Sequence, residues 1–341
     1  MPRCTPPNHR DNNALAFRSA ASNDLAVPRP SPKASHQPIL PPGTNPLAGV
    51  KITATATDPF KEVLCDDERG VWLYQGNSLE VLDALAAKYP DGLFDMIFAD
   101  PPYFLSNGGI TCHAGRMVKV DKGDWDKSRG PELNHEFNTE WLRRCQRVLK
   151  PNGTIWVTGT SHVIFSVGFA MQQLGFKILN DITWEKPNPP PNLSCRYFTH
   201  ATETVLWAAK SEKSKHCFNY PLMRQIAGGK QMKSVWRIAA PRTAEKGFGK
   251  HPTQKPVALV ERCLLASTKE GDLILDPFLG GGTTAVAALE RHRACVGIEF
   301  DENNLKIAVK RVQNAAHLFT QSKRTEEKWP DERSQSPTVT S

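Results

Sequence analysis

Between about residues 71 and 313, short apolar runs alternate with amphipathic helical stretches, and this alternation leaves few folds open to the chain. Short, mostly apolar runs are typical of parallel strands that are covered on both faces of a sheet. Strands that alternate with helices build β–α units, so the pattern predicts a doubly wound α/β fold. In such a fold ligands bind beyond the carboxyl ends of the strands, and we expect the functional residues in the loops there.

The expected elements follow from the apolar spacing and from the Pro, Gly and Asn residues between the runs. Strands are predicted at Val71–Tyr74, Phe94–Ala99, Thr154–Thr158, Ile178–Trp184, Glu203–Ala208, Asp272–Asp276 and Ala294–Glu299. A turn is predicted at Pro151-Asn152-Gly153. Helices are predicted from Ser78, which we expect as the N-cap, to Tyr89, and at Thr139–Lys150, Pro256–Thr268, Thr283–Glu290 and Glu302–Gln313.

Both ends of the chain lack this pattern. Residues 1–55 are predicted to be a disordered extension, because ten of the 27 prolines fall within the first 50 residues. Residues 319–341 are polar and are predicted to be a flexible tail. The chain has no apolar run long enough for a membrane-spanning helix, and its first residues lack the apolar core of a secretory signal. We therefore expect no membrane contact.

The eight cysteines are spread along the chain and form no C-x-x-C pair. Scattered cysteines in a chain of 341 residues indicate reduced thiols rather than a disulfide framework. The same scatter argues against a structural zinc site.

Positive charge is concentrated in one part of the chain. The whole chain has 43 Lys and Arg against 35 Asp and Glu, a formal net charge of +8. Between Lys186 and Pro256, thirteen basic residues face three acidic ones, so this stretch carries +10 and the remainder −2. A merely solvated basic face explains such a cluster about as well as a nucleic-acid surface does. The stretch also contains aromatic side chains that suit base or sugar packing beside phosphates: Tyr197, Phe198, Phe218, Tyr220, Trp236 and Phe248.

A glycine-rich loop, Asp276-Pro277-Phe278-Leu279-Gly280-Gly281-Gly282-Thr283-Thr284, joins a predicted strand to a predicted helix. Glycines let the backbone turn sharply and approach a ligand, and the helix N-terminus offers free N–H groups. No Lys follows the glycines, which argues against a phosphate-binding P-loop. Glu299 ends the next predicted strand, where a carboxylate can accept hydrogen bonds from both ribose hydroxyls of a nucleoside. The pair predicts a ligand with an adenosine moiety, although a tight strand-to-helix turn explains the glycines alone equally well.

The turn Asp100-Pro101-Pro102-Tyr103 follows directly on a predicted strand. The two prolines lack N–H groups and stiffen the turn, which leaves the Asp side chain and the Pro101 carbonyl as acceptors. Such a pair suits an exocyclic amino group, because it can hold the N–H groups and favour a tetrahedral nitrogen whose lone pair faces an electrophile. Tyr103 is expected to stack on the plane of the base. The alternative is a rigid turn without chemistry.

Together these motifs resemble the S-adenosylmethionine-dependent amino-methyltransferases of DNA. The turn Asp100–Tyr103, called the acceptor turn below, precedes the glycine loop Asp276–Thr284 in the chain. This permuted order is similar to the β group of the family, many of whose members belong to bacterial restriction–modification systems. His251-Pro252-Thr253-Gln254-Lys255-Pro256 matches the family element that helps to hold the methionine end of the cofactor. Gly76-Asn77-Ser78 matches the element beside the cofactor adenine. The resemblance covers roughly residues 65–315.

The resemblance implies a Rossmann-like methyltransferase sheet with circularly permuted motif order and a small basic target-recognition insertion. It divides the chain into a catalytic half at 60–210, a basic target-recognition region at 211–250 and a cofactor-binding half at 251–318. It also implies S-adenosylmethionine as the cofactor, with no metal required.

Three sets of site residues follow. The resemblance implies a catalytic set of Asp100, Pro101, Pro102 and Tyr103. It implies a cofactor-binding set of Asn77, Ser78, Thr253, Lys255, Asp276, Phe278, Gly280, Gly282, Thr283, Thr284 and Glu299. The charge pattern predicts a DNA-contacting set of Lys186, Arg196, Lys213, Lys215, Arg224, Lys230, Lys233, Arg237 and Arg242.

The implied reaction is direct methyl transfer to adenine N6 of duplex DNA, after the base has been flipped out of the helix. Asp at position 100, rather than Ser, favours adenine N6 over cytosine N4. Asn77 stands where the family often has Asp, and we expect a tuned cofactor affinity from it. Residues Phe104–His135 are expected to form a mobile loop over the base. Lys186–Asn192 is expected to be a rigid loop beside the pocket or, equally, a plain linker.

Several alternatives stay open. A DNA cytosine-N4 methyltransferase and an RNA N-methyltransferase use similar turns, and a non-catalytic DNA-binding subunit is a third reading. The permuted order and the basic stretch favour DNA, and the intact Asp100 and Tyr103 argue against a binding-only protein. No Pro-Cys motif is present, which argues against C5-cytosine methylation, and no tight Asp/Glu/His constellation suggests a metal nuclease.

The expected partner is double-stranded DNA, in the bacterial cytoplasm and at the nucleoid. A homodimer and a cognate restriction endonuclease acting on the same site are left open.

Overall fold

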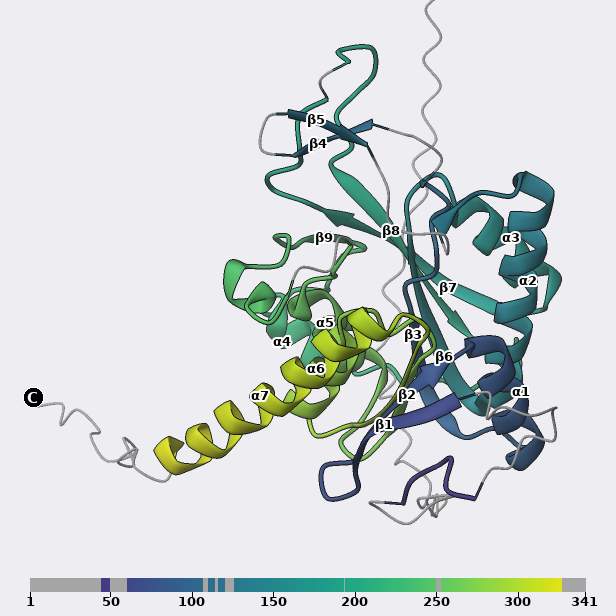
Figure 1. The fold of residues 1–341 in the computed structure, drawn as a ribbon, viewed down its shortest axis with the longest axis vertical. Helices are drawn as coiled ribbons and strands as arrows, with labels where there is room; N and C mark the ends of the chain where they lie inside the picture. Colours follow the sequence, from purple (N-terminus) through teal and green to yellow (C-terminus); the bar gives the residue numbers. More distant parts are fainter. Residues whose placement is uncertain are drawn as a thin grey trace, which may run out of the picture. The chain divides into compact units, whose positions relative to one another are not determined.

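A computed structural model describes residues 44–49, 60–106, 110–113, 116–119, 126–192, 194–249 and 253–326. Its centre is a nine-stranded mixed sheet with the strand order β1-β2-β11-β10-β3-β6-β8-β7-β9 (Figure 1). The strands are β1 Phe60–Asp66, β2 Val71–Gly76, β3 Phe94–Ala99, β6 Leu149–Gly159, β7 Lys177–Glu185, β8 Thr202–Ala209, β9 Val235–Arg237, β10 Leu273–Asp276 and β11 Ala294–Glu299. A separate hairpin contains β4 Ile110–His113 and β5 Arg116–Lys119.

Helices cover both faces of the sheet (Figure 1). One face carries α1 Ser78–Lys88, α2 Pro131–Val148 and α3 Ile164–Gln173. The other carries α4 Tyr220–Ile226, α5 Val257–Ser267, α6 Thr283–Glu290 and α7 Glu302–Glu326, with a short 3-10 helix, η2, at Thr243–Lys246. Strand residues alternate between the two cores: Ile97 packs with α1–α3, whereas Met96 and Phe98 pack with α5–α7. The doubly wound α/β prediction is confirmed.

The strand order reverses direction between β10 and β3. These neighbours are parallel, and so are the pairs β10–β11, β11–β2 and β3–β6. The chain leaves β3 toward β6 on one side and leaves β10 toward β11 on the other. A crevice therefore opens beyond the carboxyl ends of β3 and β10, which is where ligands bind in such sheets. The acceptor turn follows β3 and the glycine loop follows β10, so the topology brings the two motifs together.

The seven predicted strands are confirmed as β2, β3, β6, β7, β8, β10 and β11, whereas the predicted start of α2 and one predicted turn are wrong. Helix α2 begins at Pro131, not at Thr139, because its polar first two turns follow a Pro at the first helical position rather than an apolar pattern. Strand β6 runs through Pro151-Asn152-Gly153, where we expected a turn. A Cβ at Gly153 would lie 2.9 Å from the Phe94 carbonyl, so the glycine permits close strand approach instead of ending the strand. The elements β1, β4, β5, α3, α4, β9 and η2 were not predicted.

The N-cap of α1 is Asn77, not Ser78. The Asn77 side-chain oxygen accepts from the Leu79 N–H at 3.0 Å. Ser78 is the first helical residue, and its hydroxyl donates to the carbonyl of Pro277 in the glycine loop. Ser78 thus ties α1 to the crevice.

The ends of the fold extend beyond the predicted bounds. Within the expected disordered extension, residues 44–49 pack against the sheet: Leu47 is buried, and the Asn45 side-chain oxygen accepts from the Tyr74 hydroxyl at 2.5 Å. The Pro46 carbonyl accepts from Tyr89 and Lys88. At the other end, α7 continues to Glu326, past the predicted end at Gln313 and into the segment expected to be a flexible tail. The remaining residues of both segments lie outside the described ranges.

Membrane-spanning helices and cysteine pairing can be examined in the described residues. Within these residues, no helix is long and apolar enough to cross a membrane. Seven cysteines lie in the described ranges, and six of them are free thiols: Cys65, Cys145, Cys195, Cys217, Cys263 and Cys295.

Candidate active site

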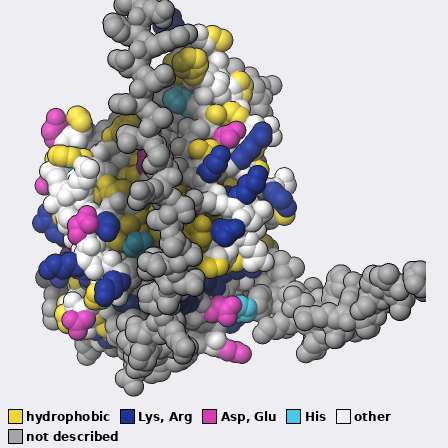
Figure 2. Space-filling model, turned by 180° about the vertical axis from the view of Figure 1, so that it is seen from behind, with side chains coloured by type: hydrophobic (Ala, Val, Ile, Leu, Met, Phe, Trp, Pro, Cys, Tyr) yellow, Lys and Arg dark blue, Asp and Glu magenta, His cyan; other side chains and the backbone are white. Residues whose placement is uncertain are grey.

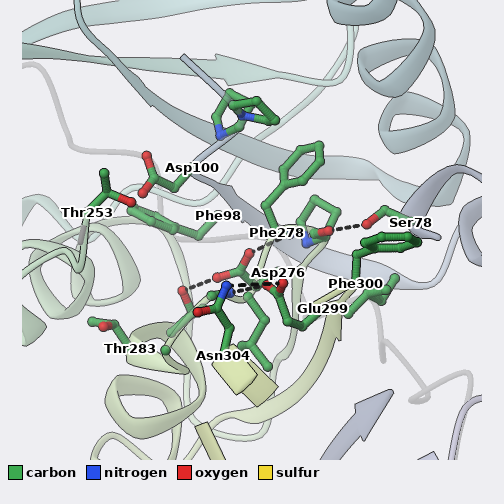
Figure 3. A pocket seen from close by; sticks show the side chains of 18 of the residues that line it. Ser78, Phe98, Asp100, Thr253, Asp276, Phe278, Thr283, Glu299, Phe300 and Asn304 are labelled. Carbon is green, nitrogen blue, oxygen red and sulfur yellow. Dashed lines mark hydrogen bonds between the residues drawn. The ribbon is translucent and has the colours of Figure 1, made fainter. Parts of the chain in front are cut away.

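The crevice beyond β3 and β10 holds a pocket of about 300 Å³. Figure 3 shows Asp100 and Thr253 at one end of the pocket and Ser78, Glu299 and Phe300 at the other. Asp276 and Phe278 of the glycine loop lie between the two ends. All four residues of the acceptor turn line the pocket. The acceptor turn therefore faces the same space as the glycine loop, as the two motifs predicted.

The Asp100 carboxylate is held by three donors. Its Oδ1 accepts from the Tyr103 hydroxyl at 2.8 Å and from the Thr158 hydroxyl at 2.6 Å. Its Oδ2 accepts from the Lys255 ammonium at 2.6 Å. An ionised carboxylate has about four acceptor sites, so three donors orient it and leave room for one more. The expectation of a bare acceptor is wrong, and Asp100 is instead an oriented one.

Tyr103 takes a different part from the expected one. Its side chain is only 6% exposed, and the Lys255 ammonium lies 5.0 Å from the ring centroid. Burial, followed by the charges of Asp100 and Glu203, raises the pKa of the hydroxyl well above its usual value, so the group stays protonated and donates. The structure shows Tyr103 holding Asp100, with little ring surface left for stacking on a base.

Lys255 has contacts that the motifs did not indicate. The resemblance implied that it helps to hold the methionine end of the cofactor; it lines the pocket, and its ammonium is paired with Asp100 and lies 3.8 Å from Glu203. Burial alone lowers the pKa of this ammonium, yet the charges of Asp100 and Glu203 outweigh that effect and raise it. Lys255 is therefore a charged donor to the acceptor turn.

Asp126 is a residue of this site that the sequence analysis missed. Its buried carboxylate accepts from the backbone N–H groups of Tyr103, Phe104 and Leu105 at 2.8, 2.8 and 3.1 Å. Phe104 has φ +58, a conformation that L residues rarely adopt. The Asp126 carboxylate stabilises this backbone and so fixes the exit of the acceptor turn. No motif marks Asp126, because it is 23 residues from Tyr103 in the chain.

The expected mobile loop Phe104–His135 contains the hairpin β4–β5 and the first turn of α2. Residues 107–109, 114–115 and 120–125 of it lie outside the described ranges. The hairpin leaves the fold at the carboxyl edge of β3, the edge that carries the pocket.

The glycines of the loop after β10 have separate uses. Gly280 lines the pocket, and its N–H donates to Glu299 Oε2 at 2.7 Å. Gly282 is the N-cap of α6 with φ +78, and a Cβ there would lie 2.8 Å from the Cβ of Ala308. Gly282 is thus required for packing of α6 against α7 and not for approach of a ligand, which corrects its expected role.

Asp276 is a buried carboxyl group at the centre of the pocket. It accepts from the Thr284 hydroxyl at 2.5 Å and from the Phe278 N–H at 3.0 Å. Burial raises its pKa to about 7 in spite of these two hydrogen bonds. A positively charged ligand group beside Asp276 would favour the ionised form, so the group is placed to respond to a cationic ligand.

The opposite end of the pocket fits a nucleoside. Glu299 Oε2 accepts from the Gly280 N–H at 2.7 Å, and Oε1 accepts from the Asp301 N–H at 2.8 Å and from the Asn304 side-chain amide at 3.5 Å, so Oε2 keeps a second lone pair for a ribose hydroxyl. Burial raises the pKa of Glu299. Phe300, 70% exposed, and Asn304 also line this end, and neither was predicted. The exposed aromatic ring next to the ribose acceptor is suited to pack on a base.

Several observations show that the pocket fits S-adenosylmethionine. Asn77, Ser78, Thr253, Thr283 and Phe278 line it as predicted. Gln254, also a lining residue, has a buried Oε1 without a hydrogen-bond partner in the described structure, so an acceptor is left for a ligand donor. His251 and Pro252 of the same element lie outside the described ranges. Carboxylates at the centre and at one end thus suit the cationic methionine part and the ribose, respectively.

The predicted DNA-contacting residues do not form one surface. Eight of the nine are exposed, whereas Lys186 is only 23% exposed and paired with Glu203. Strand β8 runs antiparallel to β6, so the residues after Ala209 lie where β6 begins. The Lys215 N–H donates to Asn152 at 2.8 Å, which places Lys213 and Lys215 at the edge of the sheet opposite the pocket. These positions argue against DNA contact by Lys186, Lys213 and Lys215, and for these residues the contact stays a prediction.

Other basic residues lie at the pocket edge. Arg237 pairs in register with Glu185 at the carboxyl end of β7, and Arg196 is exposed in the loop after β7. Figure 2 shows Lys and Arg side chains in more than one place on the face behind the view of Figure 1. Four further basic residues are exposed, and their contact with DNA stays a prediction: Arg224, Lys230, Lys233 and Arg242.

A doubly wound sheet whose acceptor turn and glycine loop meet in a pocket suited to an adenosyl ligand defines an S-adenosylmethionine-dependent methyltransferase. Residues 94–310 match the protein family described as DNA methylase, which unites N6 and N4 enzymes. The chain belongs to this family, and it is a site-specific DNA methyltransferase.

Curated relatives span most of the fold. The chain is 60% identical over 220 residues to the Type II methyltransferase M2.DpnII of Streptococcus pneumoniae, which covers 64% of this chain and 82% of the relative. It is 56% identical over 245 residues to the Type II methyltransferase M2.LlaDCHI of Lactococcus lactis subsp. cremoris, which covers 72% and 90%.

Solved structures share the fold. The M1.HpyAVI–SAM complex has a TM-score of 0.55 at 27% identity and covers 71% of this chain and 98% of that one. The cytosine-N4-specific PvuII DNA methyltransferase has a TM-score of 0.55 at 19% identity, covers 74% and 92%, and shows the likeness of fold alone.

Proposed function

We propose that this enzyme methylates the N6 amino group of adenine in duplex DNA. The observation that carries the proposal is Asp100, an oriented carboxylate with an acceptor site to spare that faces the pocket beside Pro101 and Pro102. An amino group conjugated to a ring is a poor nucleophile, because its lone pair is delocalised. An acceptor that holds one N–H out of the ring plane directs the lone pair toward the methyl group.

In this reaction the residues of the chain bind the cofactor and orient the target amino group. Bound S-adenosylmethionine supplies an activated methyl group on a sulfonium. Asp276 and Glu299 would hold its cationic and ribose parts, and Asp100 would orient the target amino group toward that methyl group. Asp100 would also hold the N–H of the amino group that gains the methyl group and gives up one proton to solvent. The target base must leave the duplex to reach the pocket, which costs a few kcal/mol, roughly, for unstacking and unpairing.

The preference for adenine over cytosine is inferred from the residue at position 100 and not from the fold. The structural relative named as cytosine-N4-specific has the same architecture, so architecture does not separate the two bases. The Asp at position 100 is the feature that favours adenine. The relatives M2.DpnII and M2.LlaDCHI are named Type II methyltransferases, which supports a role beside a restriction endonuclease of the same specificity. A homodimer and a cytoplasmic location at bacterial DNA belong to the same proposal.

The test is to incubate the purified full chain with S-adenosylmethionine and duplex DNA, and to quantify modified nucleosides by mass spectrometry. N6-methyladenine is the expected product. N4-methylcytosine as the main product would overturn the proposal and show that the enzyme is a cytosine-N4 methyltransferase. RNA of the same sequence serves as the matched control and is expected to stay unmodified.

A further inference from the structure

Glu203 lies behind the acceptor turn and belongs to none of the motifs that indicated the function. It is the second residue of β8, and its side chain is only 10% exposed. In the sequence it is one of three acidic residues in a strongly basic stretch. It does not line the pocket, so any effect on the reaction must pass through its neighbours.

Glu203 contacts two of the three donors that hold Asp100. Its Oε2 lies 3.3 Å from the Tyr103 hydroxyl and 3.8 Å from the Lys255 ammonium. Its Oε1 accepts from the ammonium of Lys186, which in turn lies 5.0 Å from the Trp184 ring. Glu203 is therefore fixed on its outer side by Lys186 and contacts Tyr103 and Lys255 on its inner side.

The charges of this cluster balance. Asp100 and Glu203 are the two carboxylates, and Lys186 and Lys255 are the two ammonium groups. Charges at such low exposure are stable only when they are paired, because burial removes their hydration. Without the Glu203 charge, the Lys186 ammonium would lose its partner, Lys255 would keep Asp100 alone, and the Tyr103 hydroxyl would lose a fixed neighbour.

We propose that Glu203 is a positioning residue for methyl transfer: it holds Lys255 and Tyr103 so that Asp100 keeps one acceptor site directed at the target amino group. This inference rests on the proposed amino-methyltransferase function. Lys186 serves as the counter-ion of Glu203, which explains why this lysine of the basic stretch faces inward.

The test is the full-length Glu203→Gln variant, assayed for transfer of tritiated methyl groups to duplex DNA. We expect kcat to fall about 100-fold, the loss typical of a mispositioned catalytic group. The KM values for cofactor and DNA should stay close to those of the wild type, because Glu203 does not line the pocket.

The pH profile separates positioning from a general loss of structure. The carboxylates that face Lys255 are Asp100, Glu203 and, from the glycine loop, Asp276, and together they keep its ammonium charged. With Gln at position 203, Lys255 should lose its proton at lower pH, so the rate of the variant should fall at alkaline pH where the wild type holds. Glu203→Asp keeps the charge and should restore the wild-type profile, with kcat between the two.

Glu270→Gln, at an exposed site outside the pocket, is the matched control and should change neither rate nor profile. A wild-type rate in Glu203→Gln, or a loss without movement of the alkaline limb, would overturn the proposal. If Glu203→Gln does not fold, a wild-type profile with a lowered kcat in Glu203→Asp supports the proposal, and a wild-type kcat or a shifted profile in that variant overturns it. If the wild type transfers no methyl group to DNA, the proposed function fails instead.

Discussion

The basic stretch between residues 186 and 256 supplies lysines to two unlike environments. Lys255 and Lys186 are enclosed and face the carboxylates of Asp100 and Glu203. Lys213 and Lys215 are exposed at the edge of the sheet opposite the pocket. Enclosed charges interact strongly with a few fixed partners, whereas exposed charges are screened within about 8 Å at physiological salt. A local excess of positive charge in a sequence is therefore not by itself a nucleic-acid surface.

The comparison predicts two kinds of response to substitution. Removing one member of the enclosed cluster of Asp100, Glu203, Lys186 and Lys255 should have a large effect. Its partners stay enclosed, and water cannot replace the interaction that they lose. Removing one exposed charge should have a small effect that depends on which edge of the sheet carries it.

Loss of the Asp100 carboxylate, which is paired with Lys255, should have the largest effect on the rate of methyl transfer. Asp100→Ala is expected to lower kcat by at least about 1,000-fold, as for removal of a preorganised group at the reacting atom. Binding of the cofactor should persist, because the other residues at its expected site are intact. Transfer from tritiated S-adenosylmethionine and calorimetry of cofactor binding measure the two quantities. Retained methyl transfer would remove Asp100 from the mechanism.

Loss of the enclosed cation should appear in stability. Lys255→Met leaves Asp100 and Glu203 without their shared partner and should lower the free energy of unfolding by about 3–5 kcal/mol, as for a broken buried ion pair. Urea unfolding measures this change. Lys246→Met, an exposed lysine of η2, is the matched control and should stay within about 0.5 kcal/mol of the wild type. Equal stability of the two variants would show that enclosure of Lys255 is energetically unimportant.

The third prediction concerns Asp276, a buried acid of the same pocket whose hydrogen bonds come from the neutral donors Thr284 and Phe278. Its pKa of about 7 means that it is protonated in the free protein below that pH. Binding of a cationic cofactor favours the ionised form, so affinity should rise with pH, by up to about tenfold for one pH unit below the pKa. Calorimetric titration between pH 6 and 8 checks the direction. Asp276→Asn should show only the pH dependence of the cofactor itself, and an unchanged slope in that variant would contradict the assignment.

The smallest effects are expected at the surface. Arg196→Gln and Arg237→Gln, at the pocket edge, should each weaken binding to duplex DNA a few-fold and reduce the slope of log K against log salt by about 0.9. Lys213→Gln and Lys215→Gln, at the opposite edge, should change neither quantity. Fluorescence anisotropy over a salt series makes the measurement. Equal effects at both edges would mean that DNA contacts the whole basic stretch.

Much of the fold could be predicted because its signals are local. The bounds of α6 at Thr283–Glu290 and of β11 at Ala294–Glu299 match the prediction. Apolar spacing and the glycines before α6 are contained within one element and its ends. Helix α2 was placed late, because its first turns are polar and its start depends on Pro131 rather than on periodicity. Asn77 was missed as a cap because Ser78 beside it is an equally good candidate by residue type.

The candidate site was predicted in its motifs but not in its contacts. The rule that ligands bind beyond the carboxyl ends of strands was sufficient to expect Asp100 and the glycine loop in one crevice. Nothing in the order of residues pairs Lys255 with Asp100, since the two are 155 positions apart. Asp126 and Glu203 carry no motif, and only their contacts with the acceptor turn identify them.

The fold class, the family and the two loops that carry the chemistry follow from the order of residues, because periodicity, glycines and prolines act on the backbone over short distances. Which lysines contact the acceptor turn and its neighbours, and which face solvent, follows only from the folded structure. Burial and charge pairing depend on strand order and direction, and the antiparallel course of β8 places Glu203 at the pocket edge and Lys213 at the opposite edge. Residues ten positions apart thereby meet different dielectric environments, and this difference sets their roles.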